Sequence, residues 1–180
     1  ANGDGLVEVA SWADQGTQLS KGTLRIEVKE GWRSGEPGAE AKIIDDVSSG
    51  KVDMAWVGAR AFDRAGVLSF QALVAPMLVD SQALQAKVFT DGIAARMVTG
   101  VDSDRLVGIG VLPGPMRKVL GVSKPFVSPK DFAGEVVGLQ DGAVAEKFLA
   151  ALGAKARTRP PGAKRDGLDR YGPPPARVRR

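Results

Sequence analysis

SPKDFAGEVVGLQDGAVAEKFLAALGA, residues 128–154, contains the signals of a turn, a strand and a helix in succession. Residues 128–132 predict a helical turn, because proline is favoured at the first position of a helix. The short apolar run at 135–140 predicts a strand. Residues 143–152 have helical apolar spacing, and we expect this helix to end at Gly153, since glycine readily adopts a left-handed helix stop. A strand followed by a helix is typical of an α/β fold.

The preceding part of the chain repeats this alternation of strands and helices. Residues 23–28 alternate apolar and charged side chains, as a half-buried strand does. Such alternation predicts an α/β fold with a mainly parallel sheet and helices on both faces. Trp12 and Trp56 lie in apolar periodic segments and are expected in the core. Helices are predicted at 6–19, 39–49 and 81–99, and further strands at 52–57, 106–112 and 118–122.

The composition excludes several kinds of catalytic and metal site. The sequence has no cysteine and no histidine, which rules out thiol catalysis, disulfides, Cys/His zinc sites and imidazole acid–base chemistry. Gly108-Ile109-Gly110 lacks the third glycine of a dinucleotide fingerprint. Asp45 and Asp46 are adjacent on a predicted helix and point about 100° apart, which favours a solvated helix face. We therefore predict no catalytic residue, no metal and no cofactor.

Basic residues are concentrated near the C-terminal end of the sequence. Residues 155–180 hold nine lysines and arginines and two aspartates, so the net charge of +4 conceals a mildly acidic body. Prolines among arginines, with few large apolar side chains, predict a disordered or poorly packed segment. This segment has one aromatic residue and no stacking platform, so we expect no nucleic-acid partner. Two alternatives stay open: a small α/β enzyme, and a protein that binds nucleic acid through the basic tail.

The sequence contains no stretch that predicts a membrane span. The longest uncharged stretch, residues 65–79, is too short and too broken by polar residues to cross a bilayer. No basic segment precedes an apolar run, so no signal peptide is expected, and Ala1 is compatible with a processed N-terminus. An extracytoplasmic location therefore stays as open as a cytosolic one.

Two loops contain side chains that suit a ligand cleft. Trp32 lies in a loop with glycines around it, where an indole can either pack on the body of the protein or line a cleft. Arg117 follows a Pro-Gly-Pro-Met sequence at the start of a predicted strand. Its position allows either an ordinary surface charge or a bidentate clamp for a ligand carboxylate.

Four short segments, taken in order, resemble segments of one protein family. Residues 47–55 (VSSGKVDMA) and 73–78 (LVAPML) are similar to a helix-to-strand turn and an aliphatic–proline stretch in the solute-binding proteins of tripartite ATP-independent periplasmic (TRAP) transporters. Residues 125–137 (PFVSPKDFAGEVV) resemble that family's signature before a ligand-facing strand, and 150–154 (AALGA) resemble the end of its next helix. Trp32, and Arg117 after a Pro-Gly sequence, make the chain resemble the dicarboxylate-type members of this family.

The resemblance implies a type II periplasmic-binding-protein-like fold, with the ligand held between two lobes. It implies a periplasmic or otherwise extracytoplasmic protein, free or tethered to the membrane. Such a protein captures a small organic solute, expected to be a carboxylate, and delivers it to membrane permease subunits. The chain is shorter than the family's members, so we expect a truncated form. The expected division is an incomplete first lobe at 1–112, the start of a second lobe at 113–156, and a Pro/Arg-rich tail at 157–180.

The resemblance also implies which residues contact the ligand. Arg117 occupies a position compatible with the family's first ligand-binding arginine. The family's second arginine lies on the following strand, where this chain has Gly138. One charge-assisted hydrogen-bonded pair, worth about 1.5–3 kcal/mol, cannot form there. Either the ligand is not a simple dicarboxylate, or another group, Arg60 or Gln140, supplies the missing contact. With Arg117, Gly138 and Trp32, these make five expected ligand-binding residues.

Overall fold

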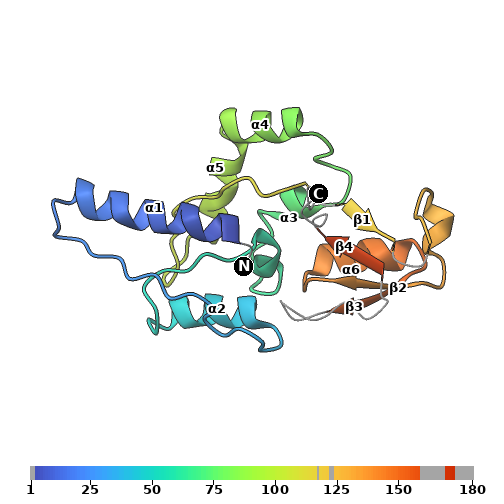
Figure 1. The fold of residues 1–180 in the computed structure, drawn as a ribbon, viewed down its shortest axis with the longest axis horizontal. Helices are drawn as coiled ribbons and strands as arrows, with labels where there is room; N and C mark the ends of the chain where they lie inside the picture. The colour runs from blue at the N-terminus through green and yellow to red at the C-terminus, as the bar shows by residue number, and fades with distance from the viewer. Residues whose placement is uncertain (1–2, 117, 122–123, 159–168, 173–180) are drawn as a thin grey trace, which may run out of the picture.

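The computed structural model describes residues 3–116, 118–121, 124–158 and 169–172. Figure 1 shows two parts side by side: a helical region, residues 3–112, and a sheet region from residue 113 onward. The helical region contains α1 (Gly3–Leu19), α2 (Ala39–Ser48), the 3-10 helix η1 (Ala59–Asp63), α3 (Gln71–Val74), α4 (Gln82–Thr90), α5 (Ile93–Val98) and η2 (Thr99–Val101). The sheet region contains β1 (Lys118–Leu120), η3 (Pro129–Phe132), β2 (Val136–Leu139), α6 (Ala143–Ala151), β3 (Lys155–Thr158) and β4 (Asp169–Gly172). In the described ranges, no helix combines the length and the apolar character that a membrane crossing requires.

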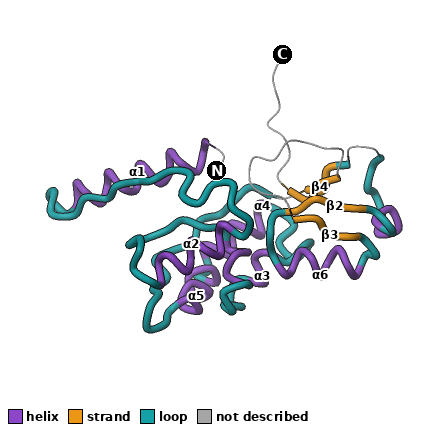
Figure 2. Tube along the Cα trace, turned by 90° about the horizontal axis from the view of Figure 1, so that it is seen from below, coloured by secondary structure: helices purple, strands orange, loops and turns teal. Residues whose placement is uncertain are grey.

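The four strands form one sheet in the order β1-β4-β2-β3. Strand β2 is parallel to β3 and β4, whereas β1 is antiparallel to β4, which confirms the predicted mainly parallel sheet. Val137 of β2 and Leu149 of α6 are fully buried and pack in one cluster with Phe132, Leu139 and Ala154. Figure 2 shows α6 along one face of the sheet. The helical members of this cluster come from α6 and η3.

Glycines set the helix ends, as the sequence predicts at Gly153 and does not predict at Gly92. Helix α1 ends before Gly22 and α6 before Gly153, and both glycines have the left-handed backbone that favours this residue. The helix predicted at 81–99 begins as expected, with the Ser81 hydroxyl accepting a hydrogen bond from a backbone N–H of the first turn. It is split into α4 and α5 because Gly92, with φ 72°, breaks the helical path.

The strands predicted at 23–28, 52–57 and 106–112 do not form. Side-chain alternation shows that a segment suits a strand, but a strand also needs a neighbouring backbone to pair its N–H and C=O groups. Within the described residues the sheet consists of β1 to β4, and none of the three segments joins it. Trp56 lies in one of these segments and is 55% exposed, and Trp12, on helix α1, is 45% exposed, so the prediction that both are core residues is wrong.

Strand β4 lies inside the segment 157–180, for which we predicted a disordered or poorly packed chain. It is inserted between β1 and β2, and β3 likewise continues to Thr158. The prediction rested on the scarcity of apolar side chains, whereas ladder pairing uses backbone groups that every residue except proline supplies in full. Residues 159–168 and 173–180 lie outside the described residues.

Candidate functional site

A cavity of about 260 Å³ lies between the helical region and the sheet region. Its wall in the helical region comes from the start of α2 and from η1 with the residue that follows it. Its wall in the sheet region comes from the carboxyl ends of β2 and β3, the edge at which open α/β sheets bind ligands. The polar or charged side chains that line it are Glu36, Glu40, Arg60, Arg64, Gln140, Asp141 and Thr158.

Arg60 is built tightly into this cavity. Its side chain is 14% exposed, and its Nη2 forms an ion pair with Glu40 Oε2. The other oxygen of Glu40 accepts a hydrogen bond from the backbone N–H of Gly58 over 3.2 Å. A Cβ on Gly58 would lie 2.1 Å from Arg60 Nη1, and one on Gly142 would lie 3.3 Å from Arg60 Cβ. Two glycines, one from each region, therefore leave the space that Arg60 occupies.

Arg64 joins the two regions at the rim of the same cavity. Its Nη2 lies 3.0 Å from Asp141 Oδ1, just after β2, and 2.8 Å from Glu146 Oε1 in α6. Hydrogen bonds to Asp141 and then Glu146 raise the pKa of Arg64 above its ordinary value. All three side chains are partly exposed, so the bridge orients the regions more than it stabilises them.

Replacing Arg64 by alanine is expected to lower the free energy of unfolding by at most about 1 kcal/mol, because partly exposed ion pairs are weak. The loss should shrink in about 1 M salt, which screens such charges. Urea unfolding at low and high salt measures both effects. Lys124→Ala is the matched control. It removes an ion pair that lies within the sheet region, between Lys124 and Glu135 at 2.7 Å, instead of one that joins the two regions. An Arg64→Ala loss of the same size at both salt concentrations would argue against an ion-pair origin.

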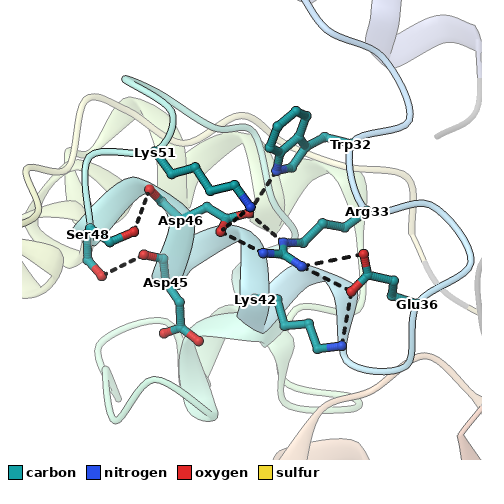
Figure 3. Close-up of polar contacts among 9 residues, drawn as sticks. Trp32, Arg33, Glu36, Lys42, Asp45, Asp46, Ser48 and Lys51 are labelled. Atoms are coloured by element: carbon teal, nitrogen blue, oxygen red, sulfur yellow. Dashed lines mark hydrogen bonds and ion pairs between the residues drawn. The ribbon is translucent and has the colours of Figure 1, made fainter.

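Asp46 is the centre of a second polar cluster, shown in Figure 3. Its oxygens accept hydrogen bonds from Trp32 Nε1 at 2.8 Å and from Arg33 Nε at 2.5 Å and Nη2 at 2.7 Å. Lys51 Nζ lies 3.6 Å away. The prediction of a solvated helix face holds for Asp45 but is wrong for Asp46, which is 5% exposed. The reason is that α2 turns this one carboxylate toward the loop before it, where Arg33 neutralises it.

The Asp46 cluster is connected to the cavity through Arg33. Arg33 Nη1 also pairs with Glu36 at 3.1 Å, and Lys42 Nζ reaches the same carboxylate at 3.0 Å. The hydrogen bond from Arg33, followed by that from Trp32, holds the pKa of Asp46 well below its usual range. Lys42 and then Arg33 lower the pKa of Glu36 in the same way. Since Glu36 lines the cavity, this cluster positions one of its walls.

Comparison with known proteins identifies the family. Residues 6–168 match the family model DctP, described as bacterial extracellular solute-binding protein, family 7. The chain belongs to this solute-binding family. A comparison with curated proteins finds no match.

Solved structures of TRAP periplasmic solute-binding proteins share the fold of this family 7 chain. The protein from Xanthobacter autotrophicus Py2 with bound β-D-galacturonate has 20% identity and a TM-score of 0.70, over 82% of this chain and 48% of its own. The protein from Citrobacter koseri with bound D-glucuronate has 21% identity and a TM-score of 0.70, over 86% and 51%. The protein from Sulfitobacter sp. NAS-14.1, with β-D-galacturonate, has 15% identity and a TM-score of 0.72, over 84% and 49%. The type II periplasmic-binding fold is thereby confirmed, and the chain spans about half the length of these structures.

The structure brings together two of the five ligand-binding residues that the sequence predicts for this family member. Arg60 and Gln140 line the same cavity from opposite regions. Gly138 is buried within β2 and Trp32 donates to Asp46, and neither lines the cavity. Arg117 lies outside the described residues.

The structure also adds Glu40 and Asp141 to the cavity, which sequence reasoning missed. A glutamate in the first turn of a helix is common, since it suits the positive end of the helix dipole, so the sequence carries no signal that sets Glu40 apart. Asp141 directly follows Gln140 at the end of β2, and its position after a strand was the one available signal.

Proposed function

We propose that this chain captures a small organic acid outside the cytoplasmic membrane and delivers it, chemically unchanged, to the permease subunits of a TRAP-type transporter. The observation that carries the proposal is the cavity between the two regions, with Arg60 on one wall and Gln140 on the other. A ligand held by both walls draws the regions together, which is how hinged binding proteins close. The helical and sheet regions then correspond to the first lobe and the start of the second.

The chemistry of related proteins supports an acid as the ligand. Structures with this fold hold β-D-galacturonate, D-glucuronate or galactonate, each a sugar with one carboxylate. The family and these neighbours are solute-binding proteins of transport systems rather than enzymes. They are periplasmic, and we extend that location to this chain, either free or tethered to the membrane.

The cavity offers donors and acceptors suited to such a ligand. Its volume of about 260 Å³ is close to the lower end of the range for small-molecule sites, about 300–1,000 Å³. Gln140 carries an amide and Thr158 a hydroxyl, and both groups can donate to and accept from sugar hydroxyls. Arg117 is proposed to hold the ligand carboxylate, because Gly138 cannot supply a guanidinium at its position. Trp32 is proposed to act through Asp46, by keeping the loop before α2 in place.

Isothermal titration calorimetry with D-galacturonate, D-glucuronate and galactonate tests the proposal, with D-galactose as the uncharged comparison. We expect at least one acid to bind, and D-galactose to bind at least about tenfold more weakly, because it lacks the charged group. Arg60→Ala should weaken the acid by about tenfold or more. Arg96→Ala is the matched control, since Arg96 is exposed on α5 and does not line the cavity.

Thermal unfolding of each variant verifies that it is folded before it is titrated. Failure of every acid to bind the folded wild-type chain would contradict the proposed function. If the wild type and the Arg60→Ala variant bind the acid with equal affinity, the acid does not bind in this cavity.

A further inference from the structure

The charged groups around the cavity neutralise one another. The described lining has two cations, Arg60 and Arg64, and three carboxylates, Glu36, Glu40 and Asp141. Arg60 is paired with Glu40, and Arg64 is paired with Asp141. Glu36 has its own cationic partners in Arg33 and Lys42. Among the described lining residues, then, each guanidinium already has a carboxylate partner before any ligand arrives.

The pair formed by Arg60 and Glu40 is held in place from several sides. The Glu40 side chain is only 28% exposed, and the Gly58 backbone N–H fixes its second oxygen at 3.2 Å. The Arg60 stem lies against Gly142 and its guanidinium against Gly58, as described above. A ligand carboxylate entering here would have to approach Glu40 or displace it from Arg60. Either event brings two negative charges together in a partly enclosed site, where screening by water is reduced.

We infer that Glu40 is a specificity-determining residue that restricts this cavity to the uncharged hydroxyl end of a monocarboxylate and discriminates against dicarboxylates. The inference rests on the proposed function and specifies the class of acid that the same cavity takes. Carboxylate oxygens accept hydrogen bonds from hydroxyls, so Glu40 attracts the polyol end of a sugar acid while it repels a second carboxylate. The single carboxylate of the ligand then points away from Arg60.

Galactonate and galactarate provide a matched pair of probes. Both are open six-carbon chains with the same hydroxyl pattern, and galactarate has a second carboxylate where galactonate has a terminal hydroxyl. Calorimetry at pH 7 should show that the wild type binds galactonate at least about tenfold more tightly than galactarate, the size expected for one like-charge contact. In Glu40→Gln that ratio should fall to about one or reverse, because Arg60 then lacks its counter-ion. Glu135→Gln is the control with the wild-type ratio, since Glu135 pairs with Lys124 away from the cavity.

The outcomes separate this inference from the function on which it rests. A wild type that binds both acids equally well, or Glu40→Gln with an unchanged ratio, would overturn the role of Glu40 and leave acid capture standing. A wild type that binds neither of these acids nor the uronates would overturn both. Should Glu40→Gln fail to fold, the double variant Glu40→Gln with Arg60→Gln removes the whole pair, and its ratio should also be close to one. If neither variant folds, the test is the relative affinity of the wild type for galactonate and galactarate. Equal affinity for the two acids would overturn the discrimination against dicarboxylates.

Discussion

Asp46→Asn is expected to lower the melting temperature by about 10 °C, the largest effect we predict for a single polar side chain. Asparagine keeps the shape of the side chain but not its charge. The Arg33 guanidinium would then face a neutral amide at the position where it now makes two charge-assisted hydrogen bonds, at 2.5 and 2.7 Å. Trp32 would also lose its charged acceptor. Removing the buried partner of an ion pair is costly because the other charge stays behind, and Arg33 would keep only Glu36, at 3.1 Å, as its carboxylate partner.

Asp45→Asn is the matched control for this substitution. The two aspartates are neighbours in α2, but Asp45 is on the exposed side, so its replacement should change the melting temperature by no more than about 2 °C. Thermal unfolding followed by circular dichroism at pH 7 measures both variants. Equal shifts for the two substitutions would contradict a structural role for the Asp46 cluster.

The acid dependence of stability gives a second test of Asp46. Its pKa is lower in the folded than in the unfolded chain, so its ionisation stabilises the folded state above the unfolded pKa of about 4. That contribution is lost as the pH falls through the folded pKa. The difference in melting temperature between the wild type and Asp46→Asn should therefore narrow when the pH is lowered from 5 towards 2. A difference that stays constant over that range would speak against an ionised Asp46 in the folded state.

Leu149→Ala is expected to reduce the free energy of unfolding by about 3 kcal/mol, within the usual range of 2–5 for a buried leucine. The Leu149 side chain is 0% exposed and packs against Val137 and Leu139 of β2. This contact joins α6 to the sheet, so the cavity left by alanine weakens the main link between helix and strands. The rigid surroundings limit how far neighbouring side chains can close the void.

Leu19→Ala makes the same chemical change at a site that is 85% exposed, at the end of α1. It should cost no more than about 0.5 kcal/mol. Urea unfolding gives both free energies. A cost below about 1 kcal/mol for Leu149→Ala would show that the cluster around it does not hold the sheet region together.

Local signals in the sequence predicted the sheet region better than the helical region. Gly153 marks the end of α6, and Ser128 and Asp131 form the turn that precedes β2, with the Ser128 N–H donating to Asp131 at 2.6 Å. The signals for these elements lie within a few residues of where they act. The strands predicted at 23–28 and 52–57 depended on partners elsewhere in the chain, and alternation alone cannot report whether a partner is present.

The candidate site shows the same limit on prediction from sequence. Arg60 and Gln140 were named as contacts, and the structure places both on one cavity. Glu40 was not, because its partner Arg60 is 20 residues away and nothing near Glu40 in the sequence indicates the pairing. The prediction that Asp46 lies on a solvated helix face was wrong for a related reason. Helical periodicity gives the direction of Asp46 relative to Asp45, but it does not tell which face of α2 the preceding loop covers.

A crystal structure of the chain grown with galactonate tests the central claim most directly. We predict that the acid occupies the cavity between the two regions, within hydrogen-bonding distance of Gln140 and Arg60, with its hydroxyl end towards Glu40. Galactonate bound only elsewhere, for example in the groove between α5 and residues 108–111, would contradict this account. A cavity without ligand, in crystals grown at a concentration that saturates binding in solution, would contradict it equally.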